Sequence, residues 1–171
     1  MSYVVIIADI PTVFTGRRPR YACGMRVLGV DLGTRRIGLA LSDDSATLAR
    51  PWRTLDAGRT PQASAESLAQ LVDTGRRNED DEMATIGAVV VGLPRKLNGD
   101  DTDQSRAARE FAGALTGLLR LDVHLQDERL TSVEAESRLA VREKDWRKRK
   151  AKLDAASAAI ILQDYLDGAT R

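Results

Sequence analysis

The feature that most constrains the fold is an unbroken apolar run at Ile86–Val91, which is rich in β-branched residues. A half-exposed strand alternates apolar and polar residues, so a continuous run of this kind predicts a strand covered on both faces. Arg26–Asp31 is a second, nearly continuous run. A sheet with two buried faces needs helices on both sides, and this indicates the α/β class.

The order of the remaining signals predicts a mixed five-stranded sheet, in which an antiparallel meander of three strands is followed by alternating helices and parallel strands. A tight turn at residues 33–36 joins the first strand to the second. The other expected elements are strands at Ile37–Ser42, near Trp52–Leu55 and at Val123–Asp127, a helix from Thr60-Pro61 to about Gly75, a charged loop at 76–82, and helices over Ala108–Leu119, from Thr131, and over Asp154–Leu166.

A chain of 171 residues suits one domain, and no stretch approaches the ~20 apolar residues that span a bilayer, so no membrane partner is expected. We expect residues 1–24 to be an N-terminal tail, disordered or an extension before a start at Met25, outside a domain over 25–168. Cys23 is the only cysteine and His124 the only histidine. This excludes an intrachain disulfide, gives little support to zinc or to His-dependent catalysis, and suits a reducing cytoplasm.

Asp31 ends the first strand within Gly29-Val30-Asp31-Leu32-Gly33. A carboxylate beside so much apolar sequence is costly unless it is paired or binds a cation. The flanking glycines leave room for a phosphate or a metal ion to approach the backbone. The alternative interpretation is an aspartate that only caps the turn.

Two further carboxylates occupy comparable places. Glu128 follows a predicted strand, and alternation turns Asp127 and Glu128 to opposite faces, so only one of them can enter a given site. The alternative for either is a structural salt bridge. Asp154 precedes an Ala-rich helix, and its alternative is a charge favoured by the helix dipole. As a set, the three carboxylates suit Mg²⁺ or Mn²⁺, and two such ions ~3.5–4 Å apart can catalyse phosphoryl transfer.

Basic and polar side chains near these acids are the expected contacts for a phosphate backbone. The segment from Arg142 to Lys152 contains seven basic residues, although such a charge run is usually a solvated loop. The residues that we expect to bind substrate are Arg35, Arg36, Arg95, Lys96, Asn98, Arg129, Thr131, Arg147, Lys148, Arg149 and Lys150.

Four stretches of the chain carry distinctive motifs: Arg26–Ala40, Val90–Pro94 with Asn98-Gly99, Asp127–Ser132 with Glu134-Ala135, and Asp154 with Ala158–Leu162 and Tyr165-Leu166. In this order they resemble the YqgF/RuvX family. The resemblance extends from about Met25 to Asp167. Ser132 stands where threonine is usual in that family, and the stretch 95–97 is more basic than the usual loop.

The resemblance implies a ribonuclease H-like domain whose metal-binding and catalytic acids are Asp31, Glu128 and Asp154. It further implies a two-metal-ion nuclease, a hydrolase of ester bonds, that matures the 5′ end of precursor 16S rRNA in the bacterial cytoplasm. The implied partners are nucleic acid and a ribosomal subunit. A second function in the family is cleavage of Holliday junctions, which requires a two-fold homodimer, whereas RNA trimming requires only a monomer.

Two other functions stay open. Asp31-Leu32-Gly33-Thr34 also resembles the phosphate loop of sugar kinases and actin-like ATPases, although the chain has no room for the second domain that closes over ATP. A non-catalytic RNA- or ribosome-binding module would keep the fold without the chemistry, although the presence of all three acids argues against it.

Overall fold

The computed structural model describes residues 24–78, 81–96, 98, 100–128 and 146–169, and a five-stranded sheet lies at its centre. The strands are β1 (Arg26–Leu32), β2 (Arg36–Ser42), β3 (Ala49–Asp56), β4 (Ile86–Leu93) and β5 (Asp122–Asp127). Their order in the sheet is β3-β2-β1-β4-β5. Strands β1, β2 and β3 form an antiparallel meander, while β4 and β5 run parallel to β1. The predicted mixed five-stranded sheet is therefore confirmed.

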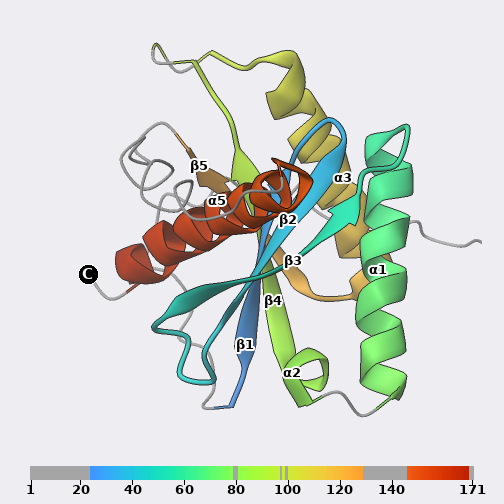
Figure 1. Ribbon diagram of the computed structural model, residues 1–171, viewed down its shortest axis with the longest axis vertical. Helices are drawn as coiled ribbons and strands as arrows, with labels where there is room; N and C mark the ends of the chain where they lie inside the picture. The colour runs from blue at the N-terminus through green and yellow to red at the C-terminus, as the bar shows by residue number, and fades with distance from the viewer. Residues whose placement is uncertain (1–23, 79–80, 97, 99, 129–145, 170–171) are drawn as a thin grey trace, which may run out of the picture.

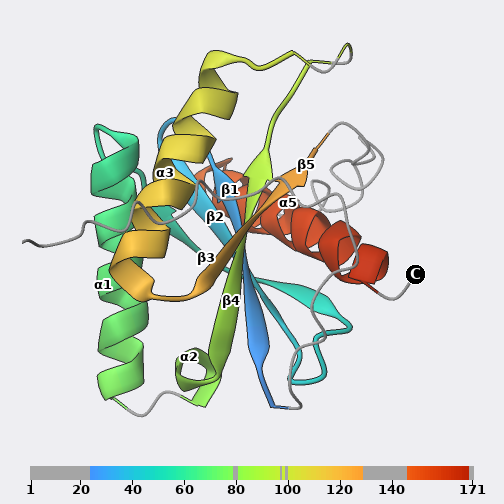
Figure 2. The same cartoon turned by 180° about the vertical axis from the view of Figure 1, so that it is seen from behind.

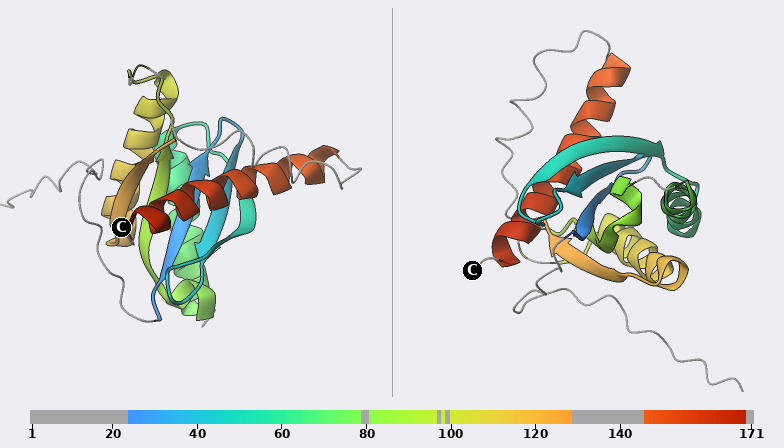
Figure 3. Two further views of the ribbon diagram at one scale, coloured as in Figure 1. Left: turned by 90° about the vertical axis from the view of Figure 1, so that its left-hand side faces the viewer. Right: turned by 90° about the horizontal axis from the view of Figure 1, so that it is seen from below.

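Helices cover both faces of the sheet, as Figures 1 and 2 show from opposite sides. Helix α5 (Trp146–Ala169) crosses one face, and α1 (Pro61–Arg77) packs beside α3 (Asp103–Leu119) on the other. The short helix α2 (Asp81–Ala84) precedes β4. The right panel of Figure 3 shows the sheet between these two layers. This is the ribonuclease H-like arrangement that the family resemblance implies.

Alternation along β1 divides its side chains between two cores. Leu28 and Val30 belong to the larger core, which α1 and α3 complete. Val27 belongs to the core beneath α5, and Gly29 lies directly against that helix. Asp31 continues the series of residues 27 and 29, so the strand directs its carboxylate to the α5 face of the sheet.

Helix α1 begins as the sequence predicts. The side chain of Thr60 accepts a hydrogen bond of 3.1 Å from the backbone N–H of Ala63, and Pro61 occupies the first helical position. The predicted charged loop at 76–82 is partly wrong, because α1 continues to Arg77 and residues 81–84 are helical.

Helix α5 begins earlier than the sequence predicts. Its first residue is Trp146, eight residues before Asp154, so the prediction that Asp154 opens the helix is wrong. The interpretation of its carboxylate as a charge at the helix N-terminus is wrong for the same reason. Arginine, lysine and alanine are strong helix formers, and they continue the helix back through residues 147–152. The helix predicted from Thr131 and the tail at 1–23 lie outside the described residues.

Candidate active site

Asp31 lies near the end of the central strand of the sheet and is half-buried. Strands β4 and β5 run parallel to β1, so their carboxyl ends reach the same edge of the sheet. In the neighbouring antiparallel strand, the partner of Asp31 is Gly38. A side chain that leaves the sheet at Asp31 therefore lies between the end of β4 and the beginning of β2.

Helix α5 brings Asp154 to the same edge. A Cβ atom on Gly38 would overlap the backbone carbonyl of Asp154, so the absence of a side chain allows the helix to rest directly on β2. Since Gly38 is the strand partner of Asp31, the helix places Asp154 over the residue that lies beside Asp31 in the sheet. The Nη1 atom of Arg36 lies 4.0 Å from Oδ2 of Asp154, and both side chains are 26% exposed.

Glu128 reaches the edge from the end of β5. Its backbone N–H donates a hydrogen bond of 3.2 Å to the carbonyl oxygen of Leu93, which extends the pairing of β4 with β5 by one residue. Its carboxylate lies over Gly92, where a Cβ atom would overlap Oε1 of Glu128 and approach Ile161 of α5 to 2.8 Å. The carboxylate of Glu128 therefore occupies space above Gly92 that a side chain at that position would also need.

The electrostatic environment of Glu128 includes the negative charges of Asp31 and Asp127. Burial, the negative charge of Asp31 and then that of Asp127 raise the pKa of Glu128 from 4.5 to about 7. Burial disfavours the ionised carboxylate, and like charges nearby disfavour it further. A raised pKa with these causes is typical of functional carboxylates.

Asp127 points away from this face, as strand alternation predicts. Its Oδ2 atom lies 3.6 Å from Nη1 of Arg95, in the loop that follows β4. His124 lies on the α5 face, where the centroid of its ring is 5.5 Å from that of Tyr165. The alternative of an ion pair therefore applies to Asp127, while Glu128 lies on the α5 face of the sheet.

The expected substrate contacts divide into several groups. Arg35 is exposed in the turn beside Asp31, and Arg36 contacts Asp154. Lys96 is exposed, and the exposed Asn98 donates to the carboxylate of Asp100 at 2.7 Å. Arg129 and Thr131 lie outside the described residues. The backbone of α5 contains Arg147, Lys148, Arg149 and Lys150, whose side chains are not among those described.

The chemistry of the three acids fits a divalent cation. Asp31, Glu128 and Asp154 offer hard oxygen ligands, which Mg²⁺ and Mn²⁺ prefer. A cation would also offset the repulsion that raises the pKa of Glu128. In the described part of the chain, no three or more Asp, Glu, His or Cys side chains already form a metal-binding group. Metal binding would therefore have to draw the three carboxylates closer together.

Two glycines beneath the acids, Gly38 and Gly92, are not predicted from the sequence to belong to the site. Both fall inside strands, where a glycine without a turn carries a weak signal for close approach of another backbone or ligand. The signal was present, but only the path of α5 across the sheet shows what approaches each glycine.

The model of a family described as "RuvX: Holliday junction resolvase" matches residues 25–168. The chain belongs to the RuvX family. Two curated relatives carry the name "Putative pre-16S rRNA nuclease". The RuvX chain described here is 38% identical over 147 residues to the protein of Pelotomaculum thermopropionicum, covering 86% of this chain and 90% of that one. It is 42% identical over 143 residues to the protein of Anaeromyxobacter dehalogenans strain 2CP-1, covering 84% and 97%.

Among solved structures, T. thermophilus RuvC in complex with a Holliday junction substrate aligns with 80% of this RuvX chain and 91% of its own length. The TM-score of this alignment is 0.44, and the two sequences are 14% identical over it. None of the helices in the described ranges combines the length and apolarity that a bilayer crossing needs.

Proposed function

We propose that the protein is a metal-dependent endonuclease that hydrolyses phosphodiester bonds at the 5′ end of precursor 16S rRNA. The observation that carries the proposal is the position of Glu128, whose carboxylate lies on Gly92 close enough to Asp31 to interact with it. The third acid, Asp154, rests on the residue that pairs with Asp31. The names of the RuvX family and of the curated relatives support a nuclease.

Asp31, Glu128 and Asp154 would hold Mg²⁺ or Mn²⁺. A pair of such ions would supply activation of a water molecule and stabilisation of the leaving oxygen of a phosphodiester. The protein's own residues supply the enclosure: α5 covers one side of the carboxylates, and Gly38 and Gly92 leave them room on the sheet. Arg36 adds a positive charge beside Asp154, where a substrate phosphate can be oriented.

The first turns of α5 are the proposed contact with the rest of the nucleic acid. They contain four consecutive basic residues, 147–150, a short distance before Asp154 in the helix. In both panels of Figure 3 this end of α5 extends beyond the sheet. Lysine and arginine that bind phosphates release counterions, so binding is expected to weaken steeply with salt. The proposed setting is the cytoplasm, with a ribosomal subunit as a further partner.

A second candidate function is resolution of Holliday junctions, which the description of the family model favours. That reaction cuts two strands symmetrically and requires two copies of the site related by a two-fold axis. Trimming of an RNA end requires one. A dimer that prefers junctions would therefore indicate resolution, whereas a monomer that prefers RNA would indicate trimming.

The test is one cleavage panel with precursor 16S rRNA, a four-way DNA junction and single strands, each with Mg²⁺ or Mn²⁺. We expect RNA cleavage by the wild-type protein and none by Asp31→Asn, with an unchanged unfolding transition. Asp44→Asn is the matched control, because Asp44 is an exposed aspartate in the turn after β2. Undiminished cleavage by Asp31→Asn would remove Asp31 from the mechanism, and preferred cleavage of the junction would favour resolution.

A further inference from the structure

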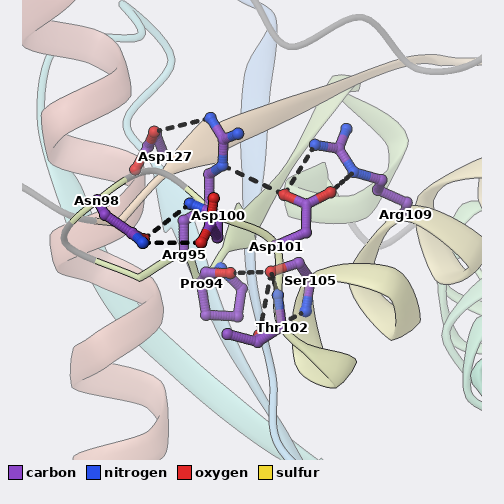
Figure 4. Close-up of polar contacts among 9 residues, drawn as sticks. All are labelled: Pro94, Arg95, Asn98, Asp100, Asp101, Thr102, Ser105, Arg109 and Asp127. Atoms are coloured by element: carbon purple, nitrogen blue, oxygen red, sulfur yellow. Dashed lines mark hydrogen bonds and ion pairs between the residues drawn. The ribbon is translucent and has the colours of Figure 1, made fainter.

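Arg95 lies between two carboxylates in the loop that joins β4 to α3. Its Nε atom is 3.3 Å from Oδ1 of Asp101, and its Nη1 atom is 3.6 Å from Oδ2 of Asp127 (Figure 4). The side chains of Arg95 and Asp127 are 26% and 24% exposed, so solvent screens their pair less than a pair on the open surface. The guanidinium thus joins this loop to the last residue of β5.

The loop that supplies Arg95 is itself tied to α3. Arg95 and Asp101 form an isolated β-bridge, and Asp101 also lies 3.3 Å from Nε of Arg109 on α3. The hydroxyl of the fully buried Ser105 donates to the carbonyl oxygen of Pro94. Arg95 is therefore held at its base by α3, and its far end can serve as a fixed point for Asp127.

Asp127 and Glu128 are consecutive, and their side chains leave the chain on opposite faces. Asp127 contacts Arg95 on one face, while Glu128 lies over Gly92 on the other. The peptide between them is the end of β5, and a rotation there would carry both carboxylates with it. A restraint on Asp127 is therefore also a restraint on Glu128.

We propose that Arg95 is a positioning residue: by binding Asp127 on one face of β5, it fixes the direction in which Glu128 enters the site on the other. The proposal rests on the proposed nuclease function, and it replaces the expectation that Arg95 binds the substrate backbone. Its side chain lies between two carboxylates, whereas Lys96, one residue later, is exposed to solvent. The two roles separate kinetically, because a phosphate contact acts on substrate affinity and a positioning residue acts on metal binding and turnover.

The test compares Arg95→Gln with Lys96→Gln, which removes the same charge from the same loop. We expect Arg95→Gln to lower kcat about tenfold, a loss of the size that is typical of coupling between contacting residues. The same variant should bind Mn²⁺ more weakly in calorimetry. Its KM for the RNA should stay within about twofold of wild type. Lys96→Gln should raise KM and leave kcat unchanged. Arg106→Gln is the matched control for lost charge, since Arg106 forms an exposed pair with Asp103 within α3.

A double-mutant cycle shows whether Arg95 acts through Asp127. If it does, Asp127→Asn combined with Arg95→Gln costs no more than the larger single change, and Arg95→Lys restores part of kcat. Additive losses, a raised KM with unchanged kcat, or Mn²⁺ binding equal to wild type would overturn the proposal while the nuclease function stands. A wild-type protein that neither cleaves nor binds Mn²⁺ would overturn both.

Discussion

Replacing Gly38 with alanine should move the acids apart while leaving each of them in the chain. An added Cβ atom would lie 1.9 Å from the carbonyl oxygen of Asp154, whereas ordinary contact begins at 3.4 Å. The obstacle is backbone in both elements, β2 and α5, so rotation of a side chain cannot relieve it. The helix has to move away by about 1.5 Å, the difference between 3.4 and 1.9 Å.

A displacement of this size exceeds the ~0.5 Å within which catalytic groups must be held, and a misplacement of about 1 Å can cost ~100-fold in rate. We expect Gly38→Ala to lower kcat/KM by at least about 100-fold. Overpacking should also lower the free energy of unfolding by about 1–3 kcal/mol. Single-turnover cleavage and denaturant unfolding, measured on the same preparation, give both values.

The matched control is Gly113→Ala. Gly113 lies in α3, and an added Cβ atom there would have no neighbour within 4 Å. An alanine in the helix should therefore raise the free energy of unfolding by about 0.5–1 kcal/mol and leave cleavage unchanged. Cleavage at the wild-type rate by Gly38→Ala would refute the reasoning, because α5 could then not rest on β2 as described.

Two other substitutions test the site and the fold. Because the pKa of Glu128 is about 7 in the folded protein against 4.5 ordinarily, its contribution to stability is complete below pH 4.5 and is lost as the pH rises through 7. Glu128→Gln should therefore raise the free energy of unfolding at pH 8 by at most about 3 kcal/mol relative to wild type, and it should change this free energy little at pH 4.5. An equal effect at both pH values would contradict the raised pKa. Ser105→Ala removes the capping box with Thr102 and the bond to Pro94, so denaturant unfolding should show a loss of about 1–3 kcal/mol, and an unchanged midpoint would mean that the cap contributes nothing.

The strands and the acids could be predicted because their signals are local. Continuous apolar runs identify β1 and β4, and alternation correctly separates Asp127 from Glu128. A carboxylate at the end of a buried strand is conspicuous in a single sequence, since its desolvation needs a reason. These local features were enough to select the edge of the sheet on which the acids lie.

The remaining features depend on contacts between distant segments. The predicted beginning of α5 was wrong because a run of basic residues is compatible both with a solvated loop and with a helix. Which of the two forms depends on the packing of the rest of the helix against the sheet. The ion pair of Arg95 with Asp127 joins the loop after β4 to the end of β5, two segments that are more than 30 residues apart, so no local pattern predicts it. The roles of Gly38 and Gly92 likewise follow from where α5 and Glu128 lie.

The helix that carries Asp154 also covers one face of the sheet. Val27, Ala40, Ala88 and Val90 are buried on that face beneath residues of α5. A polypeptide released from the ribosome before this helix is made would lack the third acid and would expose an apolar surface that favours aggregation. In such a fragment, the loss of a candidate metal ligand and the loss of the cover over this face would therefore coincide.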